Sequence, residues 1–251
     1  MNAIQKIIKS FLENGPAIGA RKIAEGVAWR LQRLFNFNLG EKIRLLVDRR
    51  FDRKFGIDTS GLRGIKELDV TAEQKTSGIH YEPTPVPALR AMLRSIPIDH
   101  SKFTFVDYGS GKGRVLLLAS EYPYRAIIGV EAAPSLHAAA LDNIEKWGRR
   151  DHLCADIRSI CVDARNFPLP DGALVLFFFT PFLSPVVDRV VDNIRQSFDR
   201  NARSIRIVYY GTNTHFIGHL SRLGFARREI YSKRPLSARA HYRGHLFSSD
   251  E

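Results

Sequence analysis

The run from Asp107 to Gly113, which reads Asp-Tyr-Gly-Ser-Gly-Lys-Gly, separates a short apolar segment at 103–107 from a helical pattern that starts at 114. Glycine takes positive φ at no steric cost and lets a backbone approach a ligand closely. Open α/β sheets bind their ligands outside the carboxyl ends of the strands, at turns of this kind. The run therefore predicts an α/β fold with a ligand site at the turn.

The rest of the chain supports this fold class, because strand-like runs alternate with helical patterns from about residue 87 onward. Such alternation predicts right-handed βαβ units and a parallel sheet covered on both faces. The last two strand-like runs are split by Arg234 and Pro235, which predicts an antiparallel hairpin at the sheet edge. We expect a Rossmann-like, doubly wound, seven-stranded sheet with strands at 103–107, 126–131, 157–162, 173–179, 204–210, 226–232 and 240–248 and helices at 88–95, 114–121, 134–147, 183–198 and 215–223.

Residues 1–78 are expected to form a basic, helical N-terminal extension and a connection, ahead of a ligand-binding domain at 79–251. Apolar residues recur at helical spacing in 4–12 and again in 20–35. A basic amphipathic helix can lie in a membrane interface or pack on its own domain, and both alternatives stay open here.

The net charge of +12 is concentrated at the two ends of the chain. Residues 1–60 hold 12 Lys and Arg against 6 Asp and Glu, residues 61–200 hold 17 of each, and residues 201–251 hold 9 against 3. This distribution favours attraction to an anionic partner, such as a nucleic acid or a membrane surface. Basicity that serves solubility alone is the competing interpretation.

Neither a long apolar run nor a signal-peptide pattern is present, so we expect a cytoplasmic protein, with peripheral association at a membrane surface left open. The two cysteines, Cys154 and Cys161, have no second pair. They predict neither a disulfide framework nor a zinc site, and no other metal site is expected.

Three classes of nucleotide-binding turn compete for residues 107–114. A P-loop reads Gly-x4-Gly-Lys-Ser/Thr, which Val106 and Gly113 exclude. A dinucleotide fingerprint reads Gly-x-Gly-x-x-Gly, and its third position here is Arg114. The observed spacing, Asp-x-Gly-x-Gly-x-Gly, resembles motif I of the class I S-adenosylmethionine methyltransferases.

The resemblance covers roughly residues 79–250 and implies S-adenosyl-L-methionine as the cofactor. Asp107 is then placed to interact with the methionine ammonium, and Glu131, at the end of the second strand, with the ribose hydroxyls. Asp163 and the backbone of Ala164 would hold the adenine. The implied turn residues are Gly109, Ser110, Gly111 and Gly113. Another Rossmann-like protein with acids at these positions is the alternative.

Upstream of the turn, residues 81–85 read Tyr-Glu-Pro-Thr-Pro. They resemble a Tyr-x-Pro-Thr-Pro element that precedes motif I in some seven-stranded methyltransferases, including protein-lysine methyltransferases. The resemblance implies that Tyr81 and Thr84 cover the methionine end of the cofactor. A proline-rich turn that leads into a helix is the simpler interpretation.

The methyl acceptor is expected at the end of the fourth strand, at Thr180, Pro181 and Phe182. These residues resemble the Asn/Asp/Ser-Pro-Pro-aromatic motif of amino-group methyltransferases, with Thr in the polar position and one proline instead of two. That departure weakens the case for methylation of a nucleic-acid base. It leaves an aromatic mouth that can stabilise a cationic amine by cation–π contact.

Other residues near this mouth carry weaker signals. Tyr209 and Tyr210 are candidates for the pocket wall, whereas a structural role is favoured for His215 and His241. Two cations of the turn, Lys112 and Arg114, suit neither a helix N-terminus nor a cationic cofactor. We expect them to point outward or toward an acidic substrate.

Gly129-Val130-Glu131, taken with motif I, loosely resembles the non-SET protein-lysine methyltransferases. The sequence therefore favours an S-adenosylmethionine-dependent methyltransferase acting on an amine, such as a protein lysine side chain. The alternatives are an RNA or DNA methyltransferase and a non-catalytic S-adenosylmethionine-binding protein at an anionic surface.

Overall fold

The computed structural model describes residues 43, 45–78, 80–148, 152–179, 182–232 and 242–250. The chain divides into two units, and the elements below all belong to the larger one, Leu45–Arg234 with Ala240–Glu251. The helices predicted at 4–12 and 20–35 lie outside the described residues.

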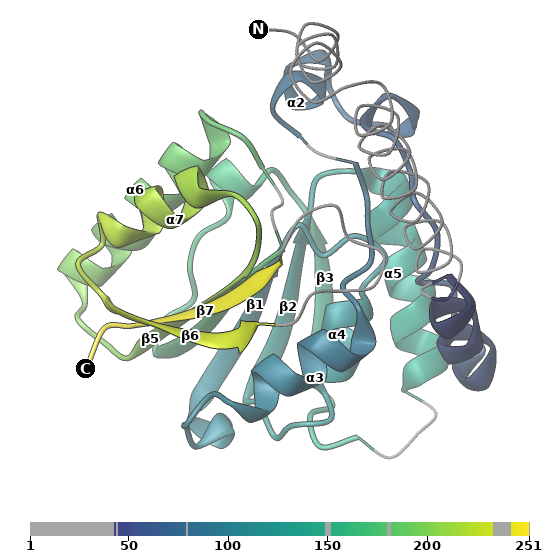
Figure 1. The fold of residues 1–251 in the computed structure, drawn as a ribbon, viewed down its shortest axis with the longest axis horizontal. Helices are drawn as coiled ribbons and strands as arrows, with labels where there is room; N and C mark the ends of the chain where they lie inside the picture. Colours follow the sequence, from purple (N-terminus) through teal and green to yellow (C-terminus); the bar gives the residue numbers. More distant parts are fainter. Residues whose placement is uncertain are drawn as a thin grey trace, which may run out of the picture. The chain divides into compact units, whose positions relative to one another are not determined.

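A seven-stranded sheet forms the centre of this unit, in the order β3-β2-β1-β4-β5-β7-β6 (Figure 1). The first five strands of this order are parallel, and β7 pairs antiparallel with both β5 and β6. The predicted Rossmann-like sheet with a C-terminal antiparallel pair is therefore confirmed. The strands are β1 Phe103–Tyr108, β2 Ala126–Glu131, β3 Ile157–Cys161, β4 Ala173–Phe178, β5 Ile205–Gly211, β6 Ala226–Ser232 and β7 Arg243–Ser248.

Helices cover both faces of the sheet, as predicted (Figure 1). One core cluster joins α3 (Val86–Arg94), α4 (Arg114–Ala119) and the end of α5 (Pro134–Trp147) to one face. A second cluster joins α6 (Val186–Arg200) and α7 (Thr214–Ser221) to the other. The short elements are η1 Ile65–Glu67, α2 Ala72–Ser77, η2 His100–Lys102 and η3 Ala164–Asn166.

Most predicted helix ends differ by one to three residues from those observed, and the sequence explains two of these differences. Helix α3 begins at Val86, because Pro87 fits the first turn, where no backbone N–H is needed. Helix α7 begins at Thr214, because the Asn213 side chain accepts from the backbone N–H groups of His215 and Phe216.

Residues 45–55 are helical and belong to the same packed unit. The ring of Phe51 lies 6.3 Å from that of Trp147 at the end of α5, and both residues are buried in one cluster. This part of the predicted extension therefore packs on the sheet domain, while the boundary near residue 78 stays a prediction. None of the described helices is long and apolar enough to cross a membrane.

Candidate cofactor and acceptor site

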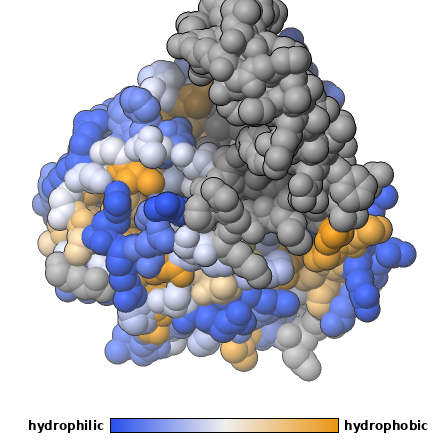
Figure 2. Space-filling model, viewed as in Figure 1, coloured by the Kyte–Doolittle hydropathy of each residue, from blue (hydrophilic) through white to orange (hydrophobic). Residues whose placement is uncertain are grey.

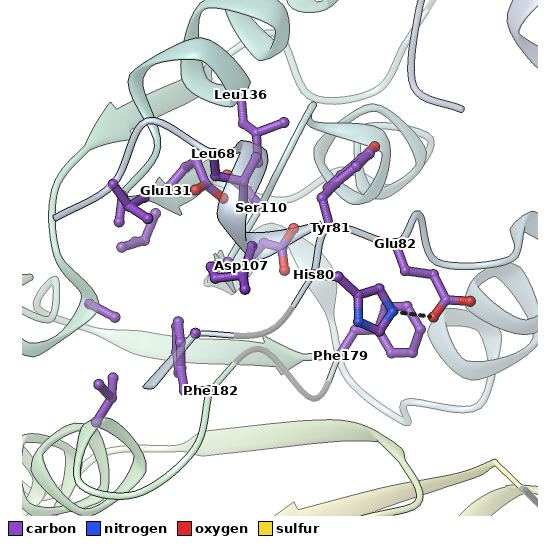
Figure 3. A pocket seen from close by; sticks show the side chains of 18 of the residues that line it. Leu68, His80, Tyr81, Glu82, Asp107, Ser110, Glu131, Leu136, Phe179 and Phe182 are labelled. Carbon is purple, nitrogen blue, oxygen red and sulfur yellow. Dashed lines mark hydrogen bonds and ion pairs between the residues drawn. The ribbon is translucent and has the colours of Figure 1, made fainter. Parts of the chain in front are cut away.

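A pocket lies at the carboxyl ends of the parallel strands, where the fold predicts a ligand (Figure 3). The sheet brings Asp107 of β1 next to Gly129 of β2 and Phe177 of β4. Eight of the ten predicted cofactor residues line the pocket: Tyr81, Thr84, Asp107, Gly109, Ser110, Glu131, Asp163 and Ala164. Their binding of a cofactor stays a prediction, but the fold gathers them in one place.

Gly111 and Gly113, the other two, shape the turn instead of lining the pocket. Gly111 has a φ of +54°, and a Cβ added there would lie 2.3 Å from Cε2 of Tyr81. Its backbone N–H donates to Oε2 of Glu131 over 2.8 Å. Only glycine leaves room for the Tyr81 ring at this point and takes the left-handed backbone without strain.

Tyr81 is held from both sides while its ring covers the turn. Its backbone pairs with that of Arg63, and its hydroxyl donates to the carbonyl oxygen of Thr59 over 2.7 Å. Burial raises the pKa of the Tyr81 hydroxyl above its ordinary value. Tyr81 therefore serves as a neutral, fixed wall of the pocket, where it was predicted to lie.

Glu131 ends β2 and is 8% exposed. Its Oε1 accepts from the backbone N–H of Ala133 and its Oε2 from that of Gly111, each over 2.8 Å. Burial raises the pKa of the carboxyl. Each carboxylate oxygen can accept two hydrogen bonds, so one position on each remains for a ligand. This is the acceptor pattern that a pair of vicinal hydroxyls, such as those of ribose, requires.

The Asp107 side chain points into the middle of the pocket (Figure 3), and the residue is 2% exposed. Its Oδ2 has no hydrogen-bond partner among the described residues. Burial raises the pKa of Asp107 well above its usual range, and the nearby charge of Glu131 adds to this effect. A buried carboxylate is costly unless a donor or a cation compensates it. An ammonium group of a ligand would supply both.

Asp163 follows β3 and caps η3. Its oxygens accept from the backbone N–H, Nε and Nη2 of Arg165 and from Nε2 of Gln74. The hydrogen bonds from Arg165 lower the pKa of Asp163 to about 2. All four acceptor positions are used, so an adenine amino group would have to displace a donor. The Gln74 amide is the neutral side-chain donor among them, and it can rotate away without breaking the Arg165 pair.

Lys112 and Arg114 were expected to point outward or toward an acidic substrate. Neither points outward, because both are buried and pair with acids of this chain. Lys112 Nζ lies 3.0 Å from both carboxylate oxygens of Asp58. Arg114 is 2% exposed and donates to Asp48 over 2.6 Å and to Thr59 Oγ1 over 2.8 Å. These cations bind the segment at residues 48–60 to the glycine-rich turn.

A segment that the sequence did not assign to the site also lines the pocket. From residues 65–82 it contributes Ile65, Leu68, Val70, Gln74, Ser77, Gly78, His80 and Glu82. One signal for it was available, because Thr71 and Gln74 form a capping box at the start of α2. The Leu183 N–H donates to the Ser77 carbonyl oxygen over 2.9 Å, which joins this segment to the chain beyond β4.

On the acceptor side, half-buried Phe182 lines the pocket and forms a backbone bridge with Gly78. Thr180 and Pro181 lie outside the described residues. Three further residues line the pocket without having been predicted: Phe179, Thr212 and Tyr242.

Tyr209 and Tyr210 do not line the pocket. The Tyr209 ring stacks on Phe216 at 4.6 Å, and the Tyr210 ring lies 5.1 Å from Phe179. His215 is exposed on α7 and away from the pocket lining, and His241 lies outside the described residues.

Among the described residues, no group of three or more His, Cys, Asp or Glu side chains could hold a metal ion. Cys154 is buried, Cys161 is exposed, and both are free thiols.

Comparison with known proteins relates the chain to others by structure. No protein-family model matches the sequence, and no curated protein matches it. Precorrin-6y C5,15-methyltransferase from Geobacter metallireducens GS-15 is similar with a TM-score of 0.50 and 15% identity, over 74% of this chain and 94% of that chain. This likeness shows the fold, which is that of a class I methyltransferase.

Two further structures match at lower TM-scores. An RNA methyltransferase from Salinibacter ruber, in complex with S-adenosyl-L-homocysteine, has a TM-score of 0.45 and 16% identity over 67% of this chain and 95% of that chain. The ribosomal protein L11 methylase from Lactobacillus delbrueckii subsp. bulgaricus has a TM-score of 0.42 and 15% identity over 64% and 75%. Because one fold hosts many functions, the activity has to be argued from the site.

Proposed function

We propose that the chain is an S-adenosylmethionine-dependent methyltransferase. The observation that carries the proposal is the pair of buried acids at adjacent strand ends. Asp107 offers an unpartnered carboxylate oxygen, and Glu131 offers one acceptor position on each oxygen. An amino acid ammonium and two ribose hydroxyls match these groups, and S-adenosylmethionine carries both.

The chain's own residues would bind and orient this cofactor. Asp107 would hold the methionine ammonium, Glu131 the ribose, and Tyr81 would keep water from the turn. Once bound, the cofactor supplies a methyl group on a positively charged sulfur. Methyl transfer needs alignment and exclusion of water more than a protein nucleophile, which suits a site built from walls and hydrogen-bond acceptors.

For the acceptor we propose an amine, such as a protein lysine side chain. The ionisable groups that line the described pocket include the acids Glu82, Asp107, Glu131 and Asp163. The lining cation Arg114 is already paired with Asp48. Phe179, Phe182 and Tyr242 add aromatic surface. Because Asp107, Glu131 and Asp163 are assigned to the cofactor, Glu82 and these aromatic rings remain for the acceptor. They favour a cationic acceptor over an anionic one.

The test is tritiated-methyl transfer from S-adenosylmethionine into a cell extract, separated afterwards into protein, RNA, lipid and small-molecule fractions. We expect label in the protein fraction. Label confined to RNA would support the second candidate, an RNA methyltransferase, which the basic ends of the chain favour. Absence of label from every fraction would contradict methyl transfer.

The acceptor end can be tested by two substitutions. Thr180→Ala and Phe182→Ala should each lower turnover in the labelled fraction while largely sparing cofactor affinity. If neither changes turnover, the acceptor does not bind at this mouth.

A further inference from the structure

His80 and Glu82 form an ionisable pair in the pocket that the proposed cofactor contacts leave unused. His80 Nε2 lies 3.4 Å from Glu82 Oε2, and the two side chains are 51% and 20% exposed. Both line the pocket. In Figure 3 the pair lies toward the Phe179 end, Glu131 and Leu136 lie at the other end, and Asp107 lies between them.

The contact with Glu82 makes one ring nitrogen of His80 a hydrogen-bond donor and leaves the other as an acceptor. A carboxylate only accepts hydrogen bonds, so the neutral ring carries its proton on Nε2 and donates it to Glu82. The Nδ1 atom then holds the lone pair, and it can accept a proton. A histidine held in one tautomer by a carboxylate is a common arrangement for a general base.

An amine acceptor needs such a base. A lysine side chain has an ordinary pKa near 10.4, so at neutral pH it arrives as an ammonium without a lone pair. Removal of one proton restores the lone pair. The amine nitrogen then bonds to the methyl carbon as the carbon–sulfur bond breaks, and the positive charge passes from sulfur to the methylated nitrogen. The proton taken at the start leaves to water from the base.

We propose that His80, oriented by Glu82, removes this proton from a cationic amine acceptor. The inference rests on the proposed function and names the group that activates its substrate. Glu82 and the exposed ring of His80 lie near Phe179 (Figure 3), whose ring is 5.9 Å from that of Tyr242. Asp107 is assigned to the cofactor ammonium, and its burial favours its neutral form.

Other ionisable groups in the same pocket contribute to any pH profile. Apart from Glu82, these are Asp107 of β1, Arg114 of α4, Glu131 of β2, Asp163 after β3, Tyr81 and Tyr242. Arg114 and Asp163 are in ion pairs with Asp48 and Arg165. A substitution of His80 itself is therefore needed to assign its contribution to the profile.

The experiment compares the wild type with His80→Gln and Glu82→Gln in the full chain. The probe is the protein fraction of the cell extract, labelled from tritiated S-adenosylmethionine at a series of pH values. His215→Gln is the matched control, because His215 is an exposed histidine outside the pocket lining. Cofactor affinity is measured on each variant by calorimetry.

We expect His80→Gln to lower the initial rate about a hundredfold near neutral pH, within the usual range for general base catalysis. Its rate should recover as the pH rises toward the pKa of the amine, and its cofactor affinity should stay within about twofold of the wild type. Glu82→Gln should also lower the rate near neutral pH, though less than His80→Gln, because the ring of His80 loses the carboxylate that orients it. The control should match the wild type.

Two results for His80→Gln would overturn the inference while the proposed function stands: a rate and profile like those of the wild type, or a loss that is equal at every pH and accompanied by loss of cofactor affinity. Label that enters only RNA would also overturn it, because the acceptor would then not be a cationic amine. A wild-type protein that binds no cofactor or transfers no label contradicts the proposed function itself.

Discussion

Two buried acids define the site at the scale of single residues. Asp107 and Glu131 are each less than a tenth exposed, and burial raises the pKa of both. The charge of Glu131 also makes ionisation of Asp107 harder. Burying two carboxyl groups side by side costs stability, and such a cost is typical of functional sites. A cationic ligand would offset it.

This cost predicts a pH dependence for the stability of the free protein. The pKa of Asp107 is raised in the folded state, so its contribution is fully present below about pH 4, its unfolded value, and is lost as the pH rises through the folded pKa. Asp107→Asn cannot titrate. The free energy of unfolding of the wild type, minus that of the variant, should fall by up to about 1.4 kcal/mol per pH unit over that window. Urea unfolding at several pH values measures it, and parallel curves would refute the raised pKa.

Gly111 offers a second prediction at this scale. Gly111→Ala places a methyl group against the Tyr81 ring and also keeps the left-handed backbone, so it should cost about 2–4 kcal/mol of unfolding free energy. Gly172→Ala is the control, because Gly172 has a φ of +82° with nothing within 4 Å. That change should cost only the backbone strain, about 1–2 kcal/mol. Equal costs in denaturant unfolding would mean that the Tyr81 contact contributes nothing.

The sequence predicted those site residues that lie at the ends of strands, because the order of strands in the sheet fixes where those residues lie. Glu131 is the last residue of β2 and Asp107 the last but one of β1, so the sheet topology alone brings them together. The partners of Lys112 and Arg114 escaped prediction, since Asp58 and Asp48 lie 54 and 66 positions away in the sequence. No periodic pattern encodes such pairs, because they depend on how a non-sheet segment folds back.

At the scale of elements, the segment at 48–60 is bound to the glycine-rich turn and to α4 by two ion pairs. The Arg114–Asp48 pair is buried, whereas Asp58, the partner of Lys112, is exposed. Asp48→Asn would leave Arg114 buried without its closest anion, and we expect it to lower the free energy of unfolding by about 3–5 kcal/mol. Asp142→Asn breaks the exposed Asp142–Lys146 pair of α5 and should cost less than about 1 kcal/mol. Urea unfolding of both variants distinguishes them. Similar small effects would show that the buried pair does not stabilise the fold.

Helix α2 should compete with the cofactor for Asp163. The Gln74 amide occupies one acceptor position of the carboxylate, over 2.9 Å. If the adenine amino group takes that position, Gln74→Ala should tighten cofactor binding by up to about fivefold, the worth of roughly 1 kcal/mol of hydrogen bonding. Calorimetry with S-adenosylmethionine decides the sign. Weaker binding would make Gln74 a cofactor ligand instead of a competitor.

The elements differ in how far the sequence reveals them. Strand β2 and helix α5 were predicted to the residue, because each is a long apolar or periodic run with clear ends. Helix α2 has only six residues, of which Ser77 alone is buried. Long-range contacts fix its position instead. Gln74 donates to Asp163, Glu73 pairs with Arg165, and the Ser77 carbonyl oxygen accepts from the backbone N–H of Leu183.

At the scale of the whole molecule, the sheet order explains why one pocket collects residues from so much of the chain. Strands β1, β2, β3 and β4 are parallel neighbours, so their carboxyl ends share one edge. The segment at 65–82 lines the pocket from outside the sheet. The sequence predicted the sheet edge as the place of the site and did not predict its second wall.

The described exposed surface differs from this pocket in carrying basic side chains on β6 and β7. Figure 2 shows mainly hydrophilic residues with small apolar areas on the face in view. Of the basic residues in the C-terminal part of the chain, Arg227 and Arg228 lie exposed on β6 and Arg243 on β7. The partner of the basic ends stays a proposal, and the acceptor test above distinguishes RNA from protein.

Calorimetric titration of S-adenosylmethionine into the wild type, Asp107→Ala and Glu131→Ala tests the central claim most directly. The account predicts saturable one-site binding to the wild type. Each substitution should weaken that binding at least tenfold, which corresponds to about 1.4 kcal/mol or more. Wild-type affinity in both variants, or no binding to the folded wild type, would contradict the assignment of this pocket to the cofactor.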